Sequence, residues 1–153
     1  MRIANATGLA LSAALALALT GLPGQAAAQM MAVKVMSEKT VTGFPFPESV
    51  GCDVAHNVLY VSQFVSALKP TQKDGMGRIS KVALDGRVIE ERFLPPKGVI
   101  LNKPKGIWVQ GNRLWVTDID VVWEFDLKTK RGRKVALPGV KFANDPTVMG
   151  KAL

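Results

Sequence analysis

A chain of 153 residues has room for one small domain, and its content of 48% hydrophobic and 21% charged residues excludes an intrinsically disordered protein. The formal net charge of +8 would suit a nucleic-acid-binding protein, but the densest basic run, residues 128–134, holds a glycine and no aromatic residue, which indicates a solvated turn and no nucleic-acid partner. One cysteine and one histidine exclude an intramolecular disulfide and a zinc site built only from His and Cys ligands of this chain.

The first 28 residues have the pattern of a signal peptide. A basic residue, Arg2, precedes an apolar run over 9–19, and a small-residue site follows at Ala26-Ala27-Ala28. The apolar run is shorter than the ~20 residues that a membrane span requires, and a Pro-Gly pair ends it. We therefore expect cleavage after Ala28, no stable membrane anchor afterwards, and a periplasmic or secreted protein.

The remaining residues, 29–153, have the pattern of an all-β protein. Short runs of β-branched and aromatic residues are separated by Gly, Asn, Asp and Pro, which predicts consecutive strands joined by turns, and no stretch of ten residues has a helical stripe. The first strand is expected at about 33–41. Cys52 lies in an apolar stretch and is expected to be a small core residue.

Two units of this chain repeat one another. Residues 47–62 align with residues 104–117, because each segment has a strand, an Asn-containing turn and then a Leu-aromatic-Val-Ser/Thr run. Residues 78–86 align with 121–129 as third strands that enter a tight turn. Fourth strands are expected at about 88–93 and 133–137.

Four strands in roughly 40 to 50 residues is the spacing of β-propeller blades. We therefore predict a partial β-propeller of four-stranded antiparallel blades at about 47–95 and 104–138, with the start of a third blade at 142–153. A blade cannot bury both faces alone, so the chain is expected to be the front portion of a longer propeller. A small β-sandwich and a homo-oligomer that completes a ring are the alternatives.

Three motifs resemble those of the SMP-30/gluconolactonase/LRE-like family. They are Phe46-Pro47-Glu48-Ser49, the pair Gly106-Ile-Trp-Val and Leu114-Trp-Val-Thr-Asp118, and Phe142-Ala-Asn144-Asp145. The resemblance covers residues 41–153 and the first half of the family's usual length. It implies a six-bladed propeller, and the enzymes of the family hydrolyse sugar lactones with a divalent cation, often calcium, in the central channel. It also implies that Glu48 is the first metal ligand and that Asn144 faces the substrate or a metal-bound water.

The positions of three polar residues agree with that placement. Glu48, Lys105 and Asn144 occupy equivalent places at the start of the innermost strand of three successive units, so they are expected to converge on one axis. Oxygen ligands from Glu and Asn suit a hard cation, which would polarise a lactone carbonyl and lower the pKa of a bound water. Lys105 is interpreted either as a group that holds an anion of the substrate or as a solvated lysine at the channel mouth. Glu48 as a plain strand charge and Asn144-Asp145 as turn residues are the alternatives.

Another acidic pair, Asp118 and Asp120 in Thr-Asp-Ile-Asp, invites a functional interpretation as well. Because the two residues follow a strand, we favour a structural role in which their carboxylates bond turn amides.

These inferences predict an exported, metal-dependent propeller of the sugar-lactone hydrolase type, truncated, without an assigned catalytic residue. The alternative is a non-catalytic periplasmic propeller that binds a small ligand or a protein partner. Phe142 favours the alternative, because lactone-hydrolysing members commonly carry an arginine at that place. A remnant of a truncated gene without function is a third interpretation.

Overall fold

The computed structural model describes residues 38–149, which contain eight β-strands and no helix, so the prediction of an all-β protein is confirmed for this part of the chain. No segment of it is therefore a helix that could cross a membrane. The predicted signal peptide, most of the strand predicted at 33–41 and the last residues of the predicted third unit lie outside the described residues. The strands are β1 Pro47–Asp53, β2 Val58–Gln63, β3 Arg78–Ala83, β4 Val88–Leu94, β5 Pro104–Gln110, β6 Arg113–Asp118, β7 Val121–Asp126 and β8 Gly132–Ala136.

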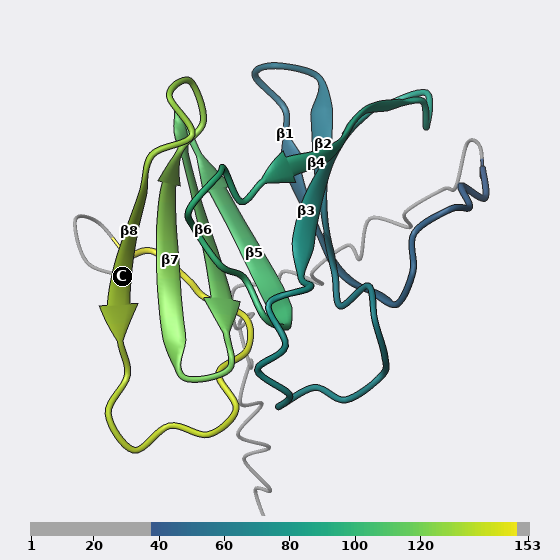
Figure 1. Ribbon diagram of the computed structural model, residues 1–153. Coiled ribbons are helices and arrows are strands. Elements are labelled where there is room, and N and C mark those ends of the chain that lie inside the picture. Colours follow the sequence, from purple (N-terminus) through teal and green to yellow (C-terminus); the bar gives the residue numbers. More distant parts are fainter. Residues whose placement is uncertain (1–37, 150–153) are drawn as a thin grey trace, which may run out of the picture. The chain divides into compact units, whose positions relative to one another are not determined.

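The strands form two antiparallel four-stranded sheets, each an up-and-down meander in chain order. One sheet has the order β1-β2-β3-β4 and the other the order β5-β6-β7-β8, and neither closes on itself (Figure 1). The two predicted four-stranded units are thus confirmed. The tight turns at Asp85-Gly86 and over 127–131 join the third and fourth strand of each sheet, and the left-handed φ of Gly86, 88°, is one that glycine adopts without strain.

The repeat extends to an irregularity of the backbone. In the first sheet Pro47 pairs with Gln63 and Val50 with Val61, so three steps along β1 correspond to two along β2. The same bulge recurs in β5 between Pro104 and Ile107. A bulge re-aims the side chains of the residues within it. Both first strands are therefore bent at the same place.

The sheets pack through their first strands. β1 lies against β5, and a Cβ added to Gly51 would stand 2.4 Å from the Ile107 Cγ2 atom, so the absence of a side chain allows the close approach. The main core lies between the sheets and includes stacked or tilted aromatic pairs of Tyr60 with Phe93 and Trp123 with Phe125. Its buried members are Val58, Tyr60, Ile79, Phe93, Leu94, Leu101, Leu114, Val116 and Phe125.

The outward face of the first sheet is apolar. Val50 and Leu84 on the first sheet are 58% and 57% exposed and line a groove with Val61 and Val82. Cys52 is exposed as well, so its prediction as a core residue is wrong. The reason is the alternation of β1, in which Gly51 and Asp53 are buried while Val50 and Cys52 point to the other face.

Two expected strands are not seen where the structure can test them. Residues 38–41 form no strand, which contradicts this part of the leading strand predicted at 33–41. Residues 142–148 form no strand either, and they lie beside the second sheet, where Ala143 N donates to Ile119 O at 2.7 Å.

Candidate functional site

The residues predicted to converge do lie together. The Glu48 carboxylate lies near enough to Lys105, Asn144 and Asp145 for all three side chains to influence its pKa. Glu48 and Lys105 sit in the equivalent bulges of β1 and β5, which explains why two residues 57 positions apart face one place. We call Glu48, Lys105, Asn144 and Asp145 the inner-strand cluster.

A glycine admits the third segment to this cluster. The Asn144 Oδ1 atom accepts hydrogen bonds from the Gly106 amide at 3.2 Å and from the Asp145 amide at 3.1 Å. A Cβ on Gly106 would stand 2.4 Å from the Asp145 backbone nitrogen and 2.5 Å from its Oδ1 atom. The Asn-Asp segment therefore rests directly on the β5 backbone, beside the residue that follows Lys105.

Lys105 is fully buried, so the interpretation as a solvated lysine is wrong for the part of the chain that the structure describes. Its ammonium donates to Lys103 O at 3.1 Å and lies 4.7 Å from the ring centroid of Phe142 and 5.7 Å from that of Phe64. Burial lowers the pKa of Lys105, and the carboxylates of Asp118 and Glu48 partly oppose this. The cluster thus contains a cation held by aromatic rings and by nearby negative charge.

The pKa of Glu48 is shifted upward, whereas that of Lys105 is shifted downward. Glu48 is exposed, but its partial burial raises the pKa of its carboxyl group, and the negative charge of Asp145 raises it further, while Lys105 and Asn144 lower it. Two carboxylates close together favour a proton or a cation between them, because either one relieves their repulsion.

The oxygen atoms of the inner-strand cluster can be compared with the ligands that a divalent cation prefers. Glu48 and Asp145 supply carboxylate oxygens, which hard cations prefer, and their mutual repulsion fits a cation placed between them. The Asn144 oxygen is already used by two backbone amides, and residues 38–149 contain no group of three His, Cys, Asp or Glu side chains that could hold a metal. The two carboxylates fit part of a calcium shell and would leave the remaining ligands to other groups.

A buried lysine that the sequence analysis did not single out supports the cluster. Lys103 is fully buried, and its ammonium donates to Asp74 Oδ2 at 2.6 Å, to Ser66 Oγ at 2.7 Å and to Phe64 O at 3.2 Å. These contacts attach the 66–77 loop to the start of β5, and the Lys103 carbonyl is the acceptor for Lys105. Nothing in the spacing of Asn-Lys-Pro-Lys predicts that both lysines are buried.

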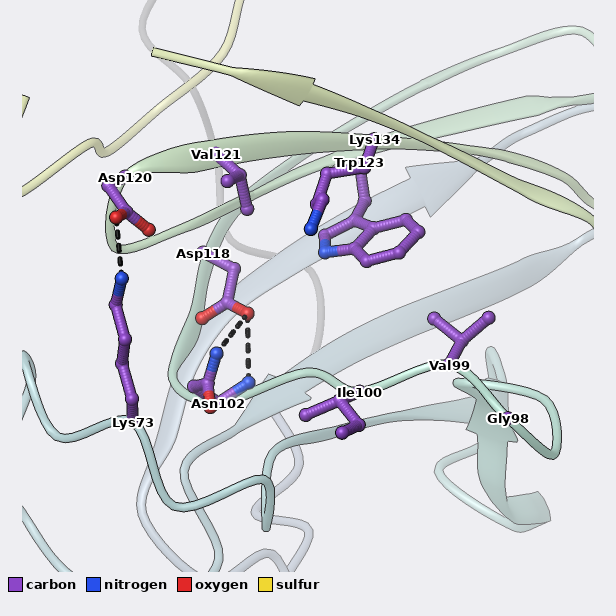
Figure 2. A pocket seen from close by; sticks show the side chains of 10 residues that line it. All are labelled: Lys73, Gly98, Val99, Ile100, Asn102, Asp118, Asp120, Val121, Trp123 and Lys134. Carbon is purple, nitrogen blue, oxygen red and sulfur yellow. Dashed lines mark hydrogen bonds and ion pairs between the residues drawn. The ribbon is translucent and has the colours of Figure 1, made fainter. Parts of the chain in front are cut away.

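The structural interpretation of Asp118 is confirmed. Its carboxylate accepts from the backbone amides of Asn102 and Lys103, each at 2.8 Å, and from Asn102 Nδ2 at 3.2 Å (Figure 2). Asp120 instead forms an ion pair with Lys73, with 2.5 Å between Nζ and Oδ2. Asp118 therefore fixes the backbone that carries Lys103 towards β5.

Together, fold and site define an all-β chain of two antiparallel four-stranded repeats with a charged cluster on their first strands. No model of a protein family matches this chain, and no curated protein matches it either.

Proposed function

We propose that the chain is the front part of an exported β-propeller of the SMP-30/gluconolactonase/LRE-like type, acting on sugar lactones at the inner-strand cluster. The convergence of Glu48, Lys105 and Asn144 from three separate segments carries this proposal. The bulge shared by β1 and β5 and the apolar outward face of the first sheet support it, since a stacked blade buries both of its faces. Further repeats, or a second copy of the chain, would cover that face.

The proposed roles follow from the charges. Glu48 and Asp145 would hold a divalent cation such as calcium, which supplies polarisation of the lactone carbonyl. Lys105 is buried and acts on a ligand through its charge, favouring the negative charge that develops on the carbonyl oxygen during attack by water. Asn144 holds the Glu48 carboxylate in position and presents its amide beside it.

The second candidate function is binding of a small ligand without turnover by a periplasmic propeller. One observation favours it: the Phe142 ring is 51% exposed and covers the Lys105 ammonium, so an aromatic surface stands at the cluster. Such a surface suits contact with a ring, or with a protein partner, more than it suits recognition of a carboxylate or carbonyl group.

Calcium titration of the full chain tests the assignment of Glu48. We expect Glu48→Gln to weaken calcium binding by about tenfold or more, because a charged ligand becomes neutral. Affinity in the parent chain should fall as the pH falls through the raised pKa of Glu48, thus at a higher pH than for an ordinary glutamate of pKa 4.5, since the protonated carboxyl group binds no cation. Isothermal titration calorimetry at several pH values measures both effects.

Glu91→Gln is the matched control, because Glu91 lies on β4 and pairs with Arg78 at 2.7 Å. It should leave calcium affinity unchanged. Equal affinity in the parent chain and in Glu48→Gln would remove Glu48 from the metal site. Hydrolysis of gluconolactone, assayed in parallel, separates the two candidate functions, because calcium binding without turnover supports the binding module.

A further inference from the structure

A second pocket lies away from the inner-strand cluster. It encloses about 470 Å³ between the segment that leads into β5 and the β6–β8 part of the second sheet, a volume typical of small-molecule sites. Val99 and Ile100 form one wall and the Trp123 indole lies opposite them (Figure 2). None of the four cluster residues lines this pocket.

The carboxylates of the pocket already have partners. Asp120 is paired with Lys73, and this hydrogen bond is the first reason that the pKa of Asp120 lies below its ordinary value. Asp118 is 1% exposed, accepts three N–H bonds and has its charge opposed by the buried Lys105. The negative charges at this place are therefore compensated within the protein.

The charged group of Lys134, unlike these carboxylates, has no ion-pair partner among residues 38–149. Its ammonium lies 5.9 Å from the ring centroid of Trp123 and forms no ion pair or hydrogen bond within residues 38–149, and its charge is the weakest of the influences that lower the pKa of Asp120. The Trp123 indole N–H likewise has no acceptor in that part of the chain, and Figure 2 shows both side chains at the same pocket, across from Ile100. Two donors that line one pocket, one of them charged, thus have no acceptor within the described residues.

We propose that this pocket binds a small carboxylic acid that carries a flat or apolar ring. The carboxylate accepts from the Lys134 ammonium and the Trp123 N–H, an arrangement that supplies one donor to each oxygen. The ring then packs on the aliphatic side chains of Val99 and Ile100, of which Ile100 is 62% exposed in the free chain. Asp120 is paired with Lys73, and Asp118 is bound by N–H donors. The ammonium of Lys134 is therefore the charge that selects an anion.

Benzoate and benzamide are suitable probes, because they have the same ring and differ in charge. We expect benzoate to bind the full chain and benzamide to bind about fivefold more weakly, the factor typical of a partly exposed ion pair. Lys134→Met keeps the aliphatic stem and should remove the preference for benzoate. Trp123→Phe keeps a ring without the N–H and should weaken benzoate more than benzamide. Chemical shift perturbation in ¹H–¹⁵N NMR spectra reports both affinity and location.

Lys128→Met is the control, since Lys128 lies in the β7–β8 turn and does not line the pocket. It should bind benzoate as the parent chain does. The proposal fails if benzoate does not bind, if both probes bind equally, or if Lys134→Met keeps the preference for benzoate. Shifts confined to Glu48, Lys105 and Asn144 would also contradict it, because they would place the anion at the inner-strand cluster.

Discussion

Lys103→Met should lower the free energy of unfolding by about 3 to 5 kcal/mol, the loss typical when one partner of a buried ion pair is removed. Methionine keeps the aliphatic stem of the lysine but removes the ammonium. The Asp74 carboxylate, which is 12% exposed, then loses its charge partner, and the Ser66 hydroxyl and the Phe64 carbonyl lose a donor. Denaturant unfolding of the full chain, followed by tryptophan fluorescence, measures the change.

A double variant separates charge from packing. Asp74→Asn in the Lys103→Met background removes the unpaired carboxylate and should recover part of the loss, because an uncompensated buried charge is the main cost. Lys128→Met in the exposed turn is the control and should change stability by less than about 0.5 kcal/mol. A loss below about 1 kcal/mol in Lys103→Met would show that this ion pair behaves like a surface pair.

The same ion pair predicts how stability depends on pH. Burial raises the pKa of Asp74, but hydrogen bonds from Lys103 and Ser66 outweigh it and hold the pKa below the ordinary value of 3.8. A carboxyl group whose pKa is lower in the folded state stabilises the fold above its unfolded pKa, and loses that contribution as the pH falls through its folded pKa. The contribution of Asp74 should therefore be complete above about pH 4 and decline below it.

The strands were predictable because the relevant signal is local. Alternation of apolar residues and turn residues is read directly from the chain, and β4 and β8 lie within a residue or so of the ranges 88–93 and 133–137. The face that a strand buries depends on its neighbours, which local patterns do not specify. The prediction of Cys52 as a core residue is wrong for this reason, since Cys52 points outward from β1.

The candidate site was predictable only in part. Equivalent positions in the repeats indicated that Glu48, Lys105 and Asn144 converge, and they do. Burial of Lys105 and Lys103 was not predictable, because lysine is seldom fully buried and the groups that compensate for it come from distant segments. The proximity of Asp145 to Glu48 likewise depends on how closely the 142–148 segment approaches β5.

That approach is tested by Gly106→Ala, which we expect to separate the Asn-Asp segment from Glu48. The new Cβ would stand 2.4 Å from the Asp145 backbone nitrogen, and a backbone atom cannot move aside as the end of a side chain can. Overpacking of this kind costs about 1 to 3 kcal/mol of stability. The pKa of Glu48 should fall towards its ordinary value of 4.5, because burial and Asp145, the two larger influences, both raise it and both decline. NMR titration of the Glu48 carboxyl group measures this change.

Gly51→Ala is the matched control for that experiment. Its Cβ meets a side-chain atom, Ile107 Cγ2, and should disturb the packing of β1 on β5 while the Asn144 contact with Gly106 stays intact. Both alanine variants are expected to lose stability, but only Gly106→Ala should shift the titration of Glu48. An unchanged pKa of Glu48 in Gly106→Ala would mean that Asn144 and Asp145 do not set its charge. The inner-strand cluster would then lack the contact between β1 and the 142–148 segment on which its proposed chemistry depends.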